Sequence, residues 1–276
     1  MIESPALQAI AEELRPYRRI GVAFSGGVDS ATLLAAAAHI LGSDSVIAFL
    51  GVSASLAERE RLIAHQIAKS LGVRLVEIHT QEMSNPQYIA NDGNRCYFCK
   101  SALFEEIAKI DLQAFQLDAI AYGENSDDSL KNDRPGQKAA REFGIAKPLS
   151  DAGLSKRDVR ALARTLNLQV AEKPATPCLA SRIKPFTPVS ALALRQVETL
   201  EDFLFSRGFS DVRARYLGEK LYIEVAEDSL SLLSDPKTQD EILDFARTHQ
   251  LPEVNFSDQP IRSGSFSATH LNSAHV

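Results

Sequence analysis

Short apolar runs alternate with amphipathic stretches along the first two thirds of the chain. The apolar runs predict buried strands at residues 20–24, 46–52, 73–78 and 117–122. Helices are predicted between them, at residues 5–16, 31–41, 57–71 and 101–110. Strands that alternate with helices at this spacing indicate an α/β domain with a doubly wound parallel sheet.

The pattern changes after a proline-rich passage at residues 173–178. A long helix is predicted at 190–207, followed by strands at 212–216 and 221–225, helical segments from Ser229 and Asp240, and a last strand near 254–256. This order is typical of a smaller α+β domain. We therefore predict a first domain over 1–175, a second over 176–268 and a disordered tail over 269–276.

The strongest local signal is Ser25-Gly26-Gly27-Val28-Asp29-Ser30, between the first strand and its helix. Two glycines let the backbone approach a ligand closely, and the amides at the helix start point at one spot with the helix dipole behind them. Ser25 and Ser30 add hydroxyls, and Asp29 can cap amides or hold a metal. No Lys follows the glycines, so this is not a Walker loop. The stretch predicts an anion site, with a ligand-free turn as the alternative.

Carboxylates follow the fourth strand, in Gly123-Glu124-Asn125-Ser126-Asp127-Asp128. In an open parallel sheet, ligands bind at the carboxyl ends of the strands, near the switch in strand order. These residues are therefore expected at the same edge as the Ser25 loop. Asp127 and Asp128 either contact a ligand there or cap a helix and remain solvated.

Three cysteines are an odd number, which speaks against a disulfide framework and for metal or catalytic use. Cys96 and Cys99 form a C-x-x-C pair at the start of a helix, a spacing that suits a shared metal or a redox pair. With Cys178, three thiolates suit a cubane iron–sulfur cluster with one open iron. A structural zinc with a fourth ligand, or simple buried thiols, are the alternatives.

Composition limits the classes of protein that need consideration. The chain has 276 residues, of which 45% are hydrophobic and 24% charged, so it can bury a core in one large or two modest domains. Its most apolar stretch, 33–41, is too short to span a membrane, and the N-terminus lacks signal-peptide character. We therefore expect a cytoplasmic protein. A net charge of -6 without a basic run argues against a long nucleic-acid partner.

The Ser25 loop resembles the pyrophosphate loop (PP-loop) of the ATP pyrophosphatases, whose domains are adenine nucleotide alpha hydrolase-like. Over nearly its full length, the chain also resembles the LarE family, the ATP-dependent sulfur transferases of nickel-pincer cofactor biosynthesis. The segments that carry this resemblance are the Ser25 loop, Arg95–Lys100, Gly123–Asp128, Arg134–Gly136, Lys173–Arg182, Arg213–Arg215 and Ile261–Ser265.

The resemblance implies a two-step reaction. A carboxylate of pyridinium-3,5-biscarboxylic acid mononucleotide is adenylated by ATP with Mg²⁺, pyrophosphate leaves, and sulfur then displaces AMP. The implied ATP contacts are Ser25, Gly26, Gly27, Val28, Asp29, Ser30, Ser53, Gly123 and Asp127, with Asp29 also catalytic.

Two sulfur sources follow from the resemblance. A [4Fe-4S] cluster on Cys96, Cys99 and Cys178 is favoured, because all three cysteines are present. The runner-up is sacrifice of Cys178, which would become dehydroalanine. A tRNA-thiolating enzyme and a non-catalytic nucleotide- and zinc-binding protein are further alternatives.

The resemblance also implies a substrate-phosphate site at Ser181, Arg182, Arg213 and Arg215. Arg213 and Arg215 are two apart on a strand, so both side chains project from one face. Glu201 and Glu224 either bind a metal or balance these arginines, and we favour balance. Residues 183–188 lack the Tyr-Gly that is usual in the family. A homo-oligomer is implied as well, with nickel-insertion and carboxylase enzymes of the pathway as partners.

Overall fold

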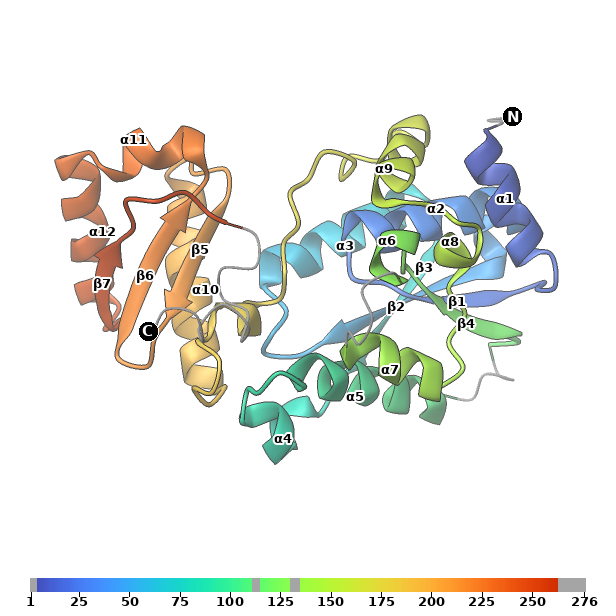
Figure 1. Cartoon of the computed structure of the whole chain (residues 1–276), viewed down its shortest axis with the longest axis horizontal. Coiled ribbons are helices and arrows are strands. Elements are labelled where there is room, and N and C mark those ends of the chain that lie inside the picture. Colours follow the sequence, from blue (N-terminus) through green and yellow to red (C-terminus); the bar gives the residue numbers. More distant parts are fainter. Residues whose placement is uncertain (1–3, 111–114, 130–134, 263–276) are drawn as a thin grey trace. The chain divides into compact units, whose positions relative to one another are not determined.

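A computed structural model of the chain describes residues 4–110, 115–129 and 135–262 (Figure 1). The chain forms two compact units, one of residues 1–81 and 96–176 and the other of residues 82–95 and 177–276. Residues 82–95, which the sequence pattern assigns to the first domain, thus pack with the second unit. Arg134, Ser263–Ser265 and the predicted tail at 269–276 lie outside the described residues.

A four-stranded sheet forms the centre of the first unit. Its strands are β1 (Ile20–Ala23), β2 (Val46–Val52), β3 (Arg74–His79) and β4 (Ala119–Tyr122), in the order β3-β2-β1-β4. Every pair is parallel, with Ile20 in register with both Val46 and Ala119. This confirms the predicted α/β fold class. The strand order switches at β1 and β4, so a ligand crevice is expected beyond their carboxyl ends.

Helices cover both faces of this sheet (Figure 1). In β2, Val46, Ala48 and Leu50 face one core, while Ile47 and Phe49 face the other, as the period of two requires. The first core is formed with α1 (Pro5–Leu14), α2 (Val28–Leu41), α3 (Glu58–Ser70), α8 (Pro148–Asp151) and α9 (Lys156–Thr165). The second is formed with α5 (Arg95–Lys109) and α7 (Pro135–Glu142).

Helix α5 begins at Arg95, six residues before the predicted start, so the C-x-x-C pair lies within its first turns and not ahead of it. The first unit also contains the short helices η1 (Ser43–Ser45) and α6 (Ser126–Ser129). A loop at residues 24–27 joins β1 to α2. The region at 79–95, predicted to be a loop, contains η2 (Glu82–Ser84) and α4 (Pro86–Ile89).

The second unit is built on a mixed sheet in the order β5-β6-β7, with β5 (Val212–Tyr216), β6 (Lys220–Val225) and β7 (Glu253–Phe256). Helix α10 (Ala191–Ser206) packs on β5, and its Leu194, Val197 and Leu200 are buried. Further helices are η3 (Leu179–Arg182), η4 (Glu227–Ser229), α11 (Leu230–Leu233) and α12 (Pro236–Thr248). Within the described ranges, no helix is long and apolar enough to cross a membrane.

Candidate functional site

The loop between β1 and α2 is held by its own hydroxyl groups. Ser25 N donates to Ser30 Oγ at 3.2 Å, and Ser30 Oγ donates to Gly27 O at 3.1 Å. Gly26 has a φ of +72°, and a Cβ atom there would lie 3.3 Å from the Ala64 side chain of α3. Gly27 is the N-cap of α2, and no side chain among the described residues caps this end. The first amides of α2 are therefore available to an anion.

Gly123 brings the end of β4 directly against this loop. A Cβ atom at Gly123 would lie 2.6 Å from Ser30 N and 2.7 Å from the Asp29 carbonyl carbon. Both are backbone atoms that cannot turn aside, so this position accepts only glycine without moving α2. The predicted ATP residue Gly123 thus adjoins the predicted loop. Ser53 follows β2 at the same edge of the sheet, where its Oγ accepts a bond of 3.2 Å from Ser55 N.

Asp29 is the centre of a polar network at the start of α2. Its Oδ2 lies 2.5 Å from Lys156 Nζ, and its Oδ1 accepts a bond of 3.4 Å from Asn125 Nδ2. Asn125 Nδ2 also donates to Asp128 Oδ2 at 2.8 Å. Asp127 Oδ2 accepts from the backbone N of Lys156 at 2.9 Å, so in this structure it binds the first residue of α9.

Lys156 is a site residue that sequence reasoning missed. The pattern Ser155-x-x-Asp158 does signal a helix start, because Ser155 and Asp158 form a capping box. Hydrogen bonds from Ser155 lower the pKa of Asp158. The capping box fixes Lys156 as the first residue of α9 but gives no sign that its side chain reaches Asp29, 127 residues earlier.

Cys96 and Cys99 lie three residues apart on α5, so their side chains share one face of the helix. The next residue, Lys100, is half-buried, and its Nζ lies 4.6 Å from the centre of the Tyr122 ring at the end of β4. A Cβ atom at Gly136 would lie 2.8 Å from Lys100 Cδ, so this glycine makes room for the lysine.

Burial lowers the pKa of Lys100. The negative charges of Glu124, Cys96 and Cys99, and that of Asp128, oppose this shift. The charge of Lys100 is therefore influenced both by the C-x-x-C pair and by the acidic residues that follow β4. Sequence reasoning assigned no role to Lys100.

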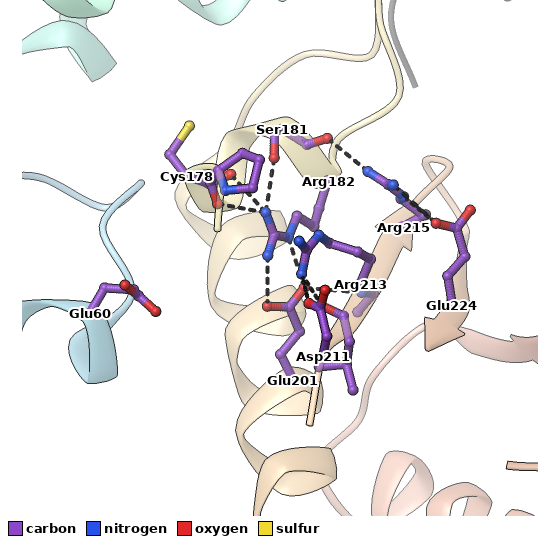
Figure 2. Close-up of polar contacts among 12 residues, drawn as sticks. Glu60, Cys178, Ser181, Arg182, Glu201, Asp211, Arg213, Arg215 and Glu224 are labelled. Atoms are coloured by element: carbon purple, nitrogen blue, oxygen red, sulfur yellow. Dashed lines mark hydrogen bonds and ion pairs between the residues drawn. The ribbon is translucent and has the colours of Figure 1, made fainter. Parts of the chain in front are cut away.

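In the second unit, the buried Arg182 organises the segment that carries Cys178 (Figure 2). Arg182 and Glu201 are both 0% exposed, and Arg182 Nε donates to Glu201 Oε1 at 2.8 Å. Arg182 Nη1 donates to Pro177 O at 2.6 Å and to Ser181 Oγ at 3.0 Å. The Cys178 thiol itself is exposed. Arg182, predicted to bind a phosphate, thus has each guanidinium nitrogen bonded within the protein.

Arg213 and Arg215 project from β5 beside this segment (Figure 2). Arg213 forms an ion pair with Asp211, and Arg215 Nε donates to Glu224 Oε2 at 3.0 Å. Burial and the neighbouring charge of Arg182 lower the pKa of Arg213. A bound anion would stabilise the charged form of Arg213, which makes this side chain a candidate for binding a phosphate.

Glu201 and Glu224 each pair with an arginine, as the charge-balance interpretation requires. The three cysteines divide between the units, with Cys96 and Cys99 in the first and Cys178 in the second. Over the residues that the structure describes, no group of three or more His, Cys, Asp or Glu side chains is arranged to hold a metal ion.

A glycine-rich loop that opens onto a helix N-terminus, at the switch point of a parallel sheet and without a Walker lysine, is suited to bind an anion, as the resemblance to the PP-loop ATP pyrophosphatases implies. Comparison with known proteins agrees. Residues 4–91 match the asparagine synthase family model.

The chain is 32% identical to the pyridinium-3,5-bisthiocarboxylic acid mononucleotide synthase of Lactiplantibacillus plantarum, covering 78% of this chain and 77% of that protein. It is 38% identical to an uncharacterized protein of Synechocystis, covering 76% and 78%, and 29% identical to one of Methanocaldococcus jannaschii, covering 80% and 83%. The chain therefore belongs to the LarE family of PP-loop ATP pyrophosphatase enzymes.

Proposed function

We propose that this protein is an ATP-dependent sulfur transferase that converts a carboxylate of pyridinium-3,5-biscarboxylic acid mononucleotide to a thiocarboxylate. The observation that carries the proposal is the open start of α2, with Asp29 and Lys156 beside it, in a chain related to a synthase of the corresponding bisthiocarboxylic acid. The exposed Cys178, on a segment anchored by Arg182, supplies sulfur chemistry in the second unit.

In the first step, a substrate carboxylate oxygen attacks the α-phosphorus of ATP, and the bond to the bridging oxygen of the β-phosphate breaks. The leaving pyrophosphate carries the released charge. The amides at the start of α2 and the Lys156 ammonium would stabilise that charge, and Asp29 would hold the Mg²⁺ that enters with ATP. A carboxylate becomes an acyl donor in this way, because AMP is a better leaving group than oxide.

In the second step, sulfur attacks the acyl carbon, a C–S bond forms, and AMP departs with the C–O bond electrons. Cysteine thiolates are the ligands that an iron–sulfur cluster requires, and the thiols of Cys96 and Cys178 are exposed. We propose that Cys96, Cys99 and Cys178 hold a [4Fe-4S] cluster, which would supply an open iron able to carry sulfide. Sacrifice of Cys178, with loss of its sulfur, is the second hypothesis for the source.

The substrate phosphate is assigned to Ser181, Arg213 and Arg215. Arg182 contributes through its contact with Ser181 Oγ and through its hydrogen bonds to the backbone carbonyls of Pro177 and Cys178. The homo-oligomer and the pathway enzymes named as partners stay predictions.

The test is to supply ATP and the dicarboxylate mononucleotide to protein purified and reconstituted without oxygen. Pyrophosphate release is measured with thiocarboxylate formation, protein mass, iron and acid-labile sulfide. Four irons per chain with repeated turnover would support the cluster. A single turnover with loss of one sulfur from the protein mass would support sacrifice of Cys178. Absence of pyrophosphate release, with stoichiometric zinc in the protein, would refute the enzyme proposal.

A further inference from the structure

Phe186 adopts a backbone conformation that its side chain disfavours. Its φ is +64°, in the left-handed region, where a bulky residue is a genuine outlier. The other positive-φ residues besides glycine in the described part of the chain are all Asn or Gln, namely Asn91, Gln116, Asn167 and Gln250. The Phe186 side chain is 70% exposed, so burial of the ring does not compensate for this backbone.

The strain comes from a tight turn at residues 184–187. Thr187 N donates to Lys184 O at 3.0 Å, with Pro185 second in the turn and Phe186 third. This is the pattern of a type II turn, in which the third position requires a positive φ and is normally glycine. A phenylalanine in this position is therefore expected to lower the stability of the fold relative to a glycine.

Buried groups hold the turn rigidly. Asn91 is 2% exposed, and its Nδ2 donates to Lys184 O at 2.9 Å and to Thr187 O at 3.0 Å. Phe186 N donates to Asn91 O at 3.0 Å. Arg95 Nη1 binds Asn91 Oδ1 at 2.5 Å and Ala180 O at 2.7 Å. These hydrogen bonds therefore fix the backbone of the turn that carries the exposed Phe186 ring.

The turn continues directly from the segment that carries the phosphate candidates. Arg215 Nη1 donates to Ser181 O at 3.4 Å, and Ile183 pairs with Tyr216 in a parallel bridge. Lys184 N donates to Tyr216 O at 2.9 Å. Phe186 is three Cα steps beyond Ile183, or at most about 11 Å. All of these residues belong to the second unit.

We propose that Phe186 is the ring-binding residue of the substrate site, an assignment that rests on the proposed function. The face of its ring would stack on the cationic pyridinium ring, while Arg213 and Arg215 bind the phosphate of the same mononucleotide. An aromatic face attracts a cationic ring, and a preformed, rigid turn spares the binding step the loss of loop entropy. Backbone strain kept at an exposed position is typical of ligand clamps.

The first test uses the absence of tryptophan from this chain. In Phe186→Trp, a single indole replaces the ring. Titration with the pyridinium dicarboxylate mononucleotide should quench its fluorescence to a saturable limit, because a stacked cationic ring interacts strongly with indole. ATP or inorganic phosphate should not quench it. Leu192→Trp, at a position 58% exposed in the same unit, is the matched control and should show no saturable quenching.

The second test is Phe186→Gly. Glycine accepts the left-handed conformation, so the melting temperature should stay equal or rise. The Kd for the mononucleotide should rise about tenfold, whereas the Kd for ATP should not change. A fall in melting temperature that accompanies the weaker binding would mean a structural role and would overturn the assignment.

Two further outcomes would also overturn the assignment. One is equal mononucleotide binding by wild type and Phe186→Gly. The other is a change in the mass of the assembly in solution with binding unchanged, which would make Phe186 a contact between copies of the chain. Failure of the wild-type protein to bind the mononucleotide at all is a different result, because it overturns the proposed function together with the assignment.

Discussion

Lys156 Nζ lies 2.5 Å from Asp29 Oδ2, so the first residue of α9 forms an ion pair with the phosphate loop at the start of α2. Both side chains are partly exposed, which leaves them accessible to a ligand. The pair places a carboxylate suited to Mg²⁺ beside an ammonium suited to phosphate. Binding of ATP with Mg²⁺ would replace their mutual contact with contacts to the nucleotide.

Lys156→Met should weaken ATP binding by about tenfold and slow pyrophosphate release, because a charge-assisted contact to phosphate is lost. Lys156→Arg should retain part of the affinity. Calorimetric titration with ATP and a pyrophosphate assay measure the two effects. Lys147→Met is the control, since Lys147 pairs with Asp151 on the surface. Unchanged ATP affinity in Lys156→Met would remove this lysine from the site.

Gly123→Ala should impair ATP binding, because the new methyl group would meet the backbone of Asp29 and Ser30 and displace the start of α2. Gly93→Ala is the matched control, since a Cβ atom there meets nothing within 4 Å. ATP affinity and melting temperature should fall in the first variant alone. Equal behaviour of the two variants would contradict the close contact at Gly123.

Glu201→Gln should lower the free energy of unfolding by about 3–5 kcal/mol, because it leaves the Arg182 charge buried without its partner. Urea unfolding of the full chain measures the loss. Asp244→Asn is the control, since the side chains of Arg247 and Asp244 are 76% and 71% exposed and such a pair contributes at most about 1 kcal/mol. A similarly small decrease in the free energy of unfolding in both variants would contradict the larger contribution expected of the buried Arg182–Glu201 pair.

Cys96→Ala should preserve pyrophosphate release and abolish repeated sulfur transfer, if this thiol is a cluster ligand. The loop that binds ATP lies elsewhere in the chain, so the first step does not require the thiol. Iron and acid-labile sulfide in oxygen-free protein should be lost as well. Full multiple-turnover activity of Cys96→Ala would refute the ligand role of this cysteine.

Glu77 gives a pH dependence to stability. Hydrogen bonds from Arg61 and His65 lower its pKa to about 2 from 4.5. A carboxyl with a depressed pKa contributes stability above its unfolded value, and this contribution is lost as the pH falls from about 4.5 towards 2. The pair is partly exposed, so solvent screening limits the contribution to about 1 kcal/mol.

Urea unfolding at pH 5 and pH 3 tests this assignment, with Glu77→Gln compared with the wild type. The variant should lose the part of the acid dependence that Glu77 supplies, since it has no carboxyl to protonate. Glu12→Gln, at an exposed surface pair with Arg15, is the control and should retain the wild-type dependence. The same acid dependence in Glu77→Gln and the wild type would show that Glu77 is not its source.

The elements with a clear hydrophobic period were predictable from the sequence. The strands of the first unit and the helices between them follow the apolar runs, since burial alone specifies them. The start of α5 at Arg95 was not predicted, because its mixture of cysteine, aromatic and basic residues has a weak period. The start of α12 could have been predicted, since Asp235 caps it and Pro236 occupies its first position.

Those parts of the site that one continuous segment forms were predictable from the sequence. Contacts between segments that are distant in the sequence were not. The Ser25 loop was predicted from its motif, whereas the pairing of Glu201 and Glu224 with arginines was the favoured of two alternatives that the family resemblance implied. The reach of Lys156 to Asp29 depends on how α9 packs on α2, which no local pattern encodes. Full burial of Arg182 was also unexpected, because arginine is seldom buried unless a partner such as Glu201 is present.

The assignment of residues 82–95 to the second unit means that the chain passes between the units at 81/82, 95/96 and 176/177. The segments of the two units therefore alternate along the sequence, and cleavage of the chain at one position does not separate the units. A fragment ending near residue 176 would retain 82–95 but expose Tyr88 and Asn91, which are buried in the whole protein. Transplanting either unit into another protein would require a re-joined chain in place of a simple truncation.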